Sequence, residues 1–173
     1  EWDSISGEIA GIASKENPAD LATRILDTTD LTLRRSVFSR IARNVGGLSV
    51  DRMADVHNRQ LERYNSRFYE HQAEAVNCFA EDWSGDRNYV CPPIGMILRI
   101  LRHVVSTKAM FTVIIVPEWT GQPWWPLLRK MAAEWFPIVE GAQAFLTGPS
   151  GFNEPAKHPE AAWWAVRVQP QQR

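Results

Sequence analysis

The segment Asn88-Tyr89-Val90-Cys91-Pro92-Pro93-Ile94 decides the predicted fold. Its first residues suit a short buried strand, and the two prolines end that strand because proline donates no ladder hydrogen bond. Apolar residues then recur at helical spacing over residues 94–105, and an almost continuously apolar run, typical of a strand buried on both faces, follows at residues 110–116. Strand, helix and strand of this length predict a parallel crossover unit. The proline corner then lies at the carboxyl edge of the sheet, where open α/β folds bind ligands.

The rest of the chain adds strands and helices to this unit. We predict a first strand at residues 48–51, a helix from about Pro123 through Trp135, and late strands at residues 139–146 and 161–168. Residues 75–79 fit a strand or a helical turn, and the sequence does not decide between them. These elements predict an α/β fold with three layers, in which a small Rossmann-like, mainly parallel sheet spans residues 46–173.

A helical appendage precedes this domain, over residues 1–45. Asn17 and Pro18 form a typical helix start, and residues 33–45 have the spacing of an amphipathic helix that ends at two glycines. The outer face of that helix is basic. Together with arginines that follow it, this face is a candidate for phosphate contacts, although charge at such spacing is more often a solvated face. The arginines concerned are Arg34, Arg40, Arg43, Arg59, Arg63 and Arg67.

The composition is that of one folded domain. Of 173 residues, 45% are hydrophobic and 23% are charged, so the chain can bury a sizeable core. A net charge of −1 gives no overall attraction to nucleic acid. Two cysteines without CxxC spacing, and histidines without ligand spacing, predict no metal site and an intracellular protein of the nucleus or cytoplasm. No apolar run is long enough for a membrane helix, and a start at Glu1 suggests a fragment of a longer polypeptide.

Several segments, taken in order, carry a family resemblance. They are Val50-Asp51-Arg52-Met53-Ala54, Tyr64-Asn65-Ser66-Arg67, residues 73–79, Asp82-Trp83, residues 89–93 and residues 117–124. The chain resembles the C-terminal region of polyproteins from DIRS-type, tyrosine-recombinase retrotransposons. In those polyproteins a reverse transcriptase and ribonuclease H precede a domain similar to phage adenine-specific DNA methyltransferases. The resemblance covers nearly the whole chain, and residues 15–24 look like the end of the ribonuclease H domain.

The resemblance implies a catalytic motif at Cys91, Pro92, Pro93 and Ile94. Methyl transfer to an exocyclic amine needs a flipped base, a surface that stacks on it and acceptors for its amino group. The family pattern supplies Asn or Asp, two prolines and an aromatic residue. Here Cys91 is a weak hydrogen-bond partner and Ile94 offers no π face. We therefore expect a degenerate motif and impaired methyl transfer.

The resemblance also implies S-adenosylmethionine as the cofactor, held by Asp51, Asp82 and Trp83. The sequence favours simpler roles, in which Asp51 caps a turn and Trp83 belongs to the core. No glycine-rich loop follows Asp51, so we expect cofactor binding to be lost. Asp20 matches the last metal-binding carboxylate of ribonuclease H, but the other carboxylates are missing here, so Asp20 alone cannot catalyse. We expect it to be an acidic residue in the first turn of a helix, where the helix dipole favours a negative charge.

These expectations lead to one functional interpretation and two alternatives. The chain is expected to be a fragment of a retrotransposon reverse transcriptase and ribonuclease H polyprotein. Its degenerate methyltransferase-like domain would act as a structural or nucleic-acid-associated module. Its partners would be DNA or an RNA–DNA hybrid and the remainder of the polyprotein, with no membrane. The alternatives are an active S-adenosylmethionine-dependent, adenine-specific DNA methyltransferase, and a domesticated or decaying copy without activity.

Overall fold

A computed structural model of the chain describes residues 31–147, 154–155 and 161–171. Residues 1–30, with the expected helix start at Asn17 and the candidate Asp20, lie outside the described residues. The described helices are α3 (Arg35–Asn44), α4 (Ile97–Ser106), α5 (Trp125–Met131) and the 3-10 turns η1 (Cys78–Ala80), η2 (Ile94–Met96) and η3 (Gly141–Ala144). The strands are β1 (Thr32–Leu33), β2 (Val50–Asp51), β3 (Asn65–Ser66), β4 (Ala75–Val76), β5 (Asn88–Val90), β6 (Thr112–Pro117), β7 (Ala132–Ile138), β8 (Phe145–Thr147), β9 (Glu154–Pro155) and β10 (Trp163–Val168).

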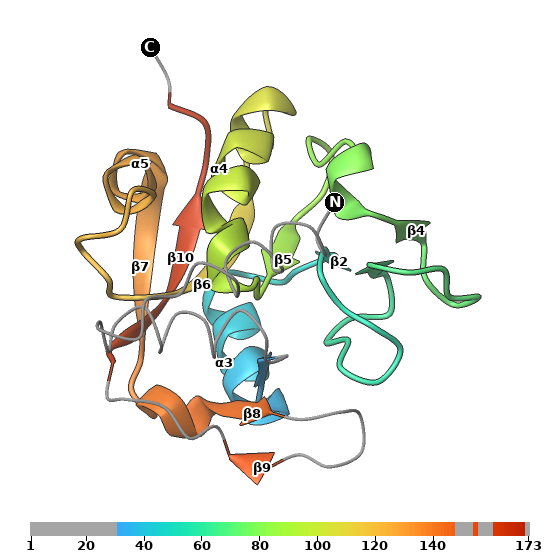
Figure 1. Ribbon diagram of the computed structural model, residues 1–173, viewed down its shortest axis with the longest axis horizontal. Helices are drawn as coiled ribbons and strands as arrows, with labels where there is room; N and C mark the ends of the chain where they lie inside the picture. The colour runs from blue at the N-terminus through green and yellow to red at the C-terminus, as the bar shows by residue number, and fades with distance from the viewer. Residues whose placement is uncertain (1–30, 148–153, 156–160, 172–173) are drawn as a thin grey trace, which may run out of the picture.

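The main sheet is mixed, so the expected mainly parallel, Rossmann-like sheet is wrong. Its strand order is β2-β5-β6-β10-β7 (Figure 1). β2 pairs with β5 and β5 with β6 in parallel, whereas β10 pairs antiparallel with both β6 and β7. The final strand thus enters between β6 and β7 from the opposite direction. Its long antiparallel ladders make up half of the neighbour pairs in the sheet.

Two other expected elements also differ, because strands that are distant in the sequence pair with these segments. Helix α5 ends at Met131, and Trp135, expected on that helix, lies in β7 because this segment pairs with β10. Of the late strand expected at residues 139–146, the structure has only β8, which pairs with β1 and β9 in a separate sheet. Both outcomes depend on partners that are distant in the sequence. The expected strands before Asp51, around Tyr89, along β6 and along β10 are confirmed.

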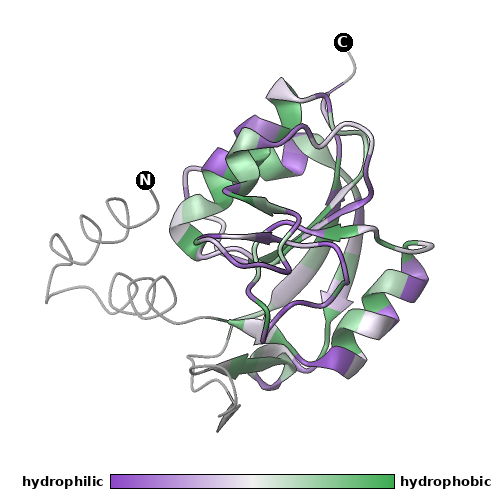
Figure 2. Ribbon diagram, turned by 90° about the vertical axis from the view of Figure 1, so that its right-hand side faces the viewer, coloured by the Kyte–Doolittle hydropathy of each residue, from purple (hydrophilic) through white to green (hydrophobic). Residues whose placement is uncertain are grey.

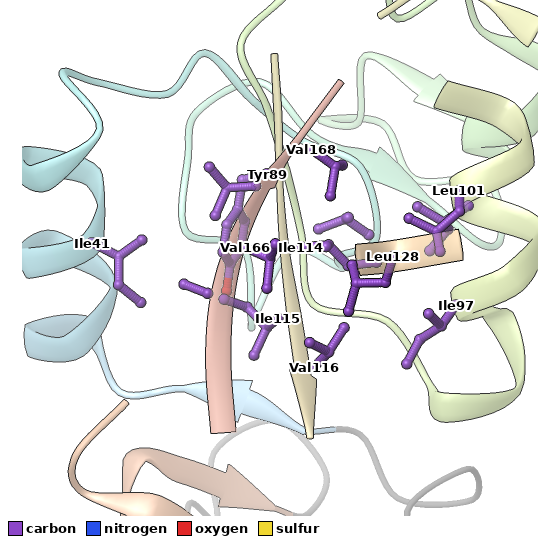
Figure 3. Packing of buried hydrophobic residues seen from close by; sticks show 14 of the residues in the cluster. Ile41, Tyr89, Ile97, Leu101, Ile114, Ile115, Val116, Leu128, Val166 and Val168 are labelled. Atoms are coloured by element: carbon purple, nitrogen blue, oxygen red, sulfur yellow. The ribbon is translucent and has the colours of Figure 1, made fainter. Parts of the chain in front are cut away.

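Helices cover both faces of the main sheet (Figures 1 and 2). The two faces are distinguished in Figure 3, where Ile41 of α3 lies on one side of the strands and Leu101 of α4 and Leu128 of α5 lie on the other. Each helix turns an apolar stripe to the sheet, as its spacing predicts. The central strand β6 is buried along its whole length. Burying one such isoleucine or valine side chain contributes roughly 1.5–3 kcal/mol, so this strand anchors the core.

The connection from β2 to β5 is irregular. It carries the small parallel pair β3 and β4 and protrudes beside the main sheet (Figure 1). Asn77, at a left-handed φ of 64°, ends β4 and caps η1. The helical turn and the strand that both fitted residues 75–79 are therefore each present, one after the other. In the part of the chain that the structure describes, no helix has the length and apolarity needed to cross a membrane.

Candidate site at the carboxyl edge of the sheet

The carboxyl ends of β2 and β5 bring Asp51, Tyr89 and Cys91 together. Asp51 lies opposite Tyr89 in the parallel register, and Cys91 follows the end of β5. The three residues line one small polar pocket, whose other lining residues are Leu31, Thr32, Leu33, Met53, Asn58 and Gln60. About 10 Å³ is available there to the centre of a water molecule, which is room for about one water. As it stands, the pocket is far too small for a nucleobase or a nucleoside cofactor.

Asp51 is the titratable group of this pocket. Its side chain is buried, with Oδ1 accepting from the Met53 amide at 3.3 Å and Oδ2 accepting from the Gln60 amide at 3.1 Å. Burial raises the pKa of this carboxyl to about 7, against the opposing effect of the two amide donors. A carboxyl group with this pKa exchanges a proton near neutral pH. Such a group suits acid–base work where a substrate can reach it.

Cys91 and Tyr89 are neutral at physiological pH. Burial raises the pKa of the Cys91 thiol to about 12 and raises the pKa of the Tyr89 hydroxyl well above its usual value. The Cys91 Sγ points to the Leu31 carbonyl at 3.6 Å. The Tyr89 hydroxyl is buried, and no conventional hydrogen-bond partner for it exists among the described residues, its polar neighbour being the Cys91 thiol. Because the thiolate is the reactive form of cysteine, Cys91 is not a nucleophile here.

Strand β1 closes the outer side of the pocket. Its residues pair with β8 in an antiparallel ladder, and the Arg34 amide donates to the Ala144 carbonyl at 2.8 Å. On the pocket side, Gln60 Nε2 donates to the Leu33 carbonyl at 2.7 Å. The segment is therefore held from both sides. Strand β1 is therefore a fixed wall of the pocket.

The remaining residues of the degenerate motif form the corner itself. Pro92 is buried, and Pro93, at φ −55° and ψ 146°, precedes the turn η2 that leads into α4. Ile94 is only 3% exposed and packs in the core. The corner thus has the rigid geometry that the sequence predicts. Its fourth residue faces the protein interior, where it offers no surface to a ligand.

The three predicted cofactor residues are not brought together. Trp83 is buried beside His103 of α4, with ring centroids 4.8 Å apart, whereas Tyr89, the register partner of Asp51, contacts Phe38 of α3 at 4.8 Å. Because α3 and α4 lie on opposite faces of the sheet, Trp83 and the pocket are on opposite faces too (Figures 2 and 3). Trp83 also donates from Nε1 to the Cys78 carbonyl at 2.9 Å, as a core tryptophan does.

Asp82 has a local role in the same turn. Its Oδ1 accepts from the Ser84 amide at 2.9 Å, and this hydrogen bond lowers the pKa of its carboxyl. The side chain is exposed and belongs to the turn that precedes β5. Asp82 thus stabilises its own turn. Its role as a cofactor contact stays a prediction.

A buried arginine next to Asp51 was not singled out by the sequence analysis. Arg52 is 2% exposed and donates to the side chains of Asn88 at 2.7 Å, Asn65 at 3.0 Å and Asp86 at 3.1 Å. Its guanidinium carbon lies 5.3 Å from the centre of the Trp83 ring. Arg52 therefore ties the long β2–β5 connection to the sheet. The signal in the sequence is a charged pair, Asp-Arg, at the end of a buried strand.

Most arginines of the predicted basic face make contacts with other groups of the same chain. Arg34 Nε donates to the Gln143 carbonyl at 2.7 Å, Arg40 makes a bidentate contact with the Glu140 carboxylate, and Arg59 Nη1 donates to the Leu61 carbonyl at 3.1 Å. Arg63 bridges Glu74 and Asp86. These side chains are therefore held by contacts within the protein. Arg43, in the last turn of α3, is exposed.

The described residues hold no group of three or more His, Cys, Asp or Glu side chains that could bind a metal ion. The polar pocket at Asp51 is therefore a site for hydrogen bonding and proton exchange, built on the carboxyl ends of two parallel strands. Comparison of the sequence with protein-family models finds no match, and comparison with curated proteins finds none either.

Proposed function

We propose that this chain belongs to a retrotransposon polyprotein, and that its methyltransferase-like domain no longer transfers methyl groups and serves as a structural, nucleic-acid-associated module. One observation carries the proposal. The pocket between Asp51 and Cys91, where the resemblance implies a flipped base, has room for about one water and is closed by β1. The partners we propose are DNA or an RNA–DNA hybrid and the remainder of the polyprotein.

Opening this pocket requires the loss of specific contacts. The hydrogen bonds from Gln60 to Leu33 and from the Arg34 amide to Ala144 would break, together with the pairing of β1 with β8. At about 1 kcal/mol net for each hydrogen bond, the opening costs several kcal/mol before any ligand binds. A base that entered would then meet a neutral thiol at Cys91, and Ile94 would offer it no aromatic side chain. The closed state therefore supports a domain without methyl-transfer activity.

The test is a methyl-transfer assay on the full chain with radiolabelled S-adenosylmethionine and an adenine-containing DNA duplex. We expect no incorporation by the wild type, and none by the double variant Cys91→Asn, Ile94→Tyr, because restoring the motif does not open the pocket. Incorporation by the wild type above the level of an Asp51→Asn variant would overturn the proposal. Incorporation by the double variant alone would overturn the part of the proposal that rests on closure.

The alternative function, adenine methylation that uses S-adenosylmethionine, is favoured by one observation. Asp51 lies at the carboxyl edge with a pKa of about 7, where a proton acceptor for an amine would be useful. An enzyme of this kind would show an activity that rises with pH through about 7 as Asp51 ionises, and the assay above, repeated from pH 6 to pH 8, separates the two functions.

A further inference from the structure

Basic side chains gather at the amino edge of the main sheet, opposite the Asp51 pocket. Helices α3, α4 and α5 are followed along the chain by β2, β6 and β7. The carboxyl end of each helix therefore lies near the start of its strand, at this edge. The reversed strand β10 also ends here, in contrast to β2, β5, β6 and β7, which begin here. The mixed topology, which the sequence did not predict, therefore brings Arg167 of β10 to the start of β6.

Two arginines share one aromatic ring at this edge. The guanidinium carbons of Arg87 and Arg167 lie 3.7 Å and 5.3 Å from the centre of the Phe111 ring, next to the start of β6. Arg87 also donates to the carbonyls of Gly47 and Val45, which follow α3. Both guanidinium groups are thus held in place before any ligand binds. Arginines fixed in this way lose little side-chain entropy on binding an anion.

Two exposed cations flank this pair. Arg43 lies two residues before Val45, and Lys108, at a left-handed φ of 55°, follows the end of α4 three residues before Phe111. Within the described part of the chain, no hydrogen bond or ion pair holds the side chain of Arg43 or Lys108. We name Arg43, Arg87, Lys108 and Arg167 the amino-edge cluster.

Few acidic groups oppose this cluster. Glu134 pairs with Arg167 at 3.1 Å, and the carboxylate of Asp86, the neighbour of Arg87, is already bound by Arg52 and Arg63. A basic residue in the last turn of a helix interacts favourably with the helix dipole, which accounts for Arg43 alone. It does not account for Arg87, just before β5, and Arg167, in β10, which stack on one ring. The arrangement instead suits a ligand with several negative charges.

We propose that the amino-edge cluster binds the phosphate backbone of a nucleic acid. This inference rests on the nucleic-acid association proposed above and assigns it to a surface remote from the Asp51 pocket. With a net charge of only −1, the chain attracts a polyanion through local charge. Four cations that contact phosphates give a salt dependence of log K on log salt with a slope between roughly −3 and −4, for single strands and duplexes respectively.

The test measures binding of the full chain to a fluorescently labelled DNA duplex and to an RNA–DNA hybrid by fluorescence anisotropy. The salt concentration is varied from about 20 to 200 mM. The variant Arg43→Gln, Lys108→Gln removes two charges from side chains without structural partners. We expect about a hundredfold loss of affinity at the lowest salt, which shrinks as salt rises because the slope is smaller in magnitude by roughly 1.4–1.8.

The control of equal charge is Arg35→Gln, Arg59→Gln, which removes two charges near the amino end of α3, where Arg35 donates to the Arg59 and Gln60 carbonyls. Arg35 lies eight residues before Arg43 on α3, which is about 12 Å along the helix axis. We expect the control to bind with nearly the wild-type slope. Equal losses in the two double variants, or no loss in the amino-edge variant while the wild type binds, would overturn the inference and leave the proposed function standing. No binding by the wild type would overturn both.

Discussion

Replacing Asp51 with asparagine tests the electrostatics of the pocket. In the folded protein the pKa of this carboxyl is about 7, whereas an unperturbed aspartate titrates at 3.8. Between these values the folded state binds the proton and the unfolded state does not, so unfolding releases a proton. The contribution of Asp51 to stability is therefore full below pH 4 and is lost as pH rises to 7. The asparagine variant has no such contribution.

The size of the effect follows from the two pKa values. One pKa unit corresponds to about 1.4 kcal/mol, and the shift from 3.8 to about 7 then gives a loss on the order of 2–3 kcal/mol between pH 5 and pH 8 for this group alone. His103, whose pKa is lowered mainly by burial, changes stability in the opposite direction over part of the same range. It is present in both proteins. The difference between variant and wild type therefore isolates Asp51.

The assay is urea unfolding followed by tryptophan fluorescence at pH 5, 6, 7 and 8, chosen as roughly the window in which Asp51 titrates. We expect the stability of Asp51→Asn relative to the wild type to increase by roughly 2–3 kcal/mol from pH 5 to pH 8, although one oxygen acceptor is lost at every pH. A stability difference that does not change with pH would refute the assignment of a raised pKa to this carboxyl.

Three further predictions concern the network, the thiols and the core. Arg52→Met leaves the buried side-chain oxygens of Asn65 and Asn88 without their donor and removes one of the two arginines that bind Asp86, so we expect a loss of about 3–5 kcal/mol in the free energy of unfolding measured in urea, and a loss below about 1 kcal/mol would contradict the network. Burial raises the pKa of Cys78 and Cys91 to about 12, so both thiols should resist iodoacetamide at pH 8 and react once the chain is unfolded, as mass spectrometry would detect; rapid labelling of the native protein argues against the closed pocket. Ile114→Ala in the fully buried strand β6 should cost about 2–5 kcal/mol, and a near-neutral effect would disagree with its place in the core.

The sequence predicts the elements whose signals are local. Residues 94–105 carry a helical apolar pattern, and β6 is apolar throughout, so the crossover unit from β5 to β6 follows from periodicity alone. The meeting of Asp51 with Cys91 was also predictable in principle, because neighbouring parallel strands end at the same edge of a sheet. No local signal contradicts either conclusion.

The errors concern contacts between distant residues. Trp135 sits in an apolar run that fits a helix or a strand, and its pairing with β10, near residue 166, decides the outcome. The closure of the pocket depends on β1 pairing with β8, more than 100 residues away. Trp83 packs on His103 of α4, whereas Tyr89, the register partner of Asp51, packs on Phe38 of α3, on the other face of the sheet. The spacing of apolar and polar residues along the chain does not predict these contacts.

We expect the carboxyl-edge pocket to be closed to a cofactor. Calorimetric titration of the full chain with S-adenosylmethionine, with an Asp51→Ala variant as the control, tests it most directly. We expect no saturable heat up to millimolar cofactor for either protein. Saturable binding by the wild type that Asp51→Ala abolishes would contradict it, because the cofactor would then occupy a site that β1 is expected to cover.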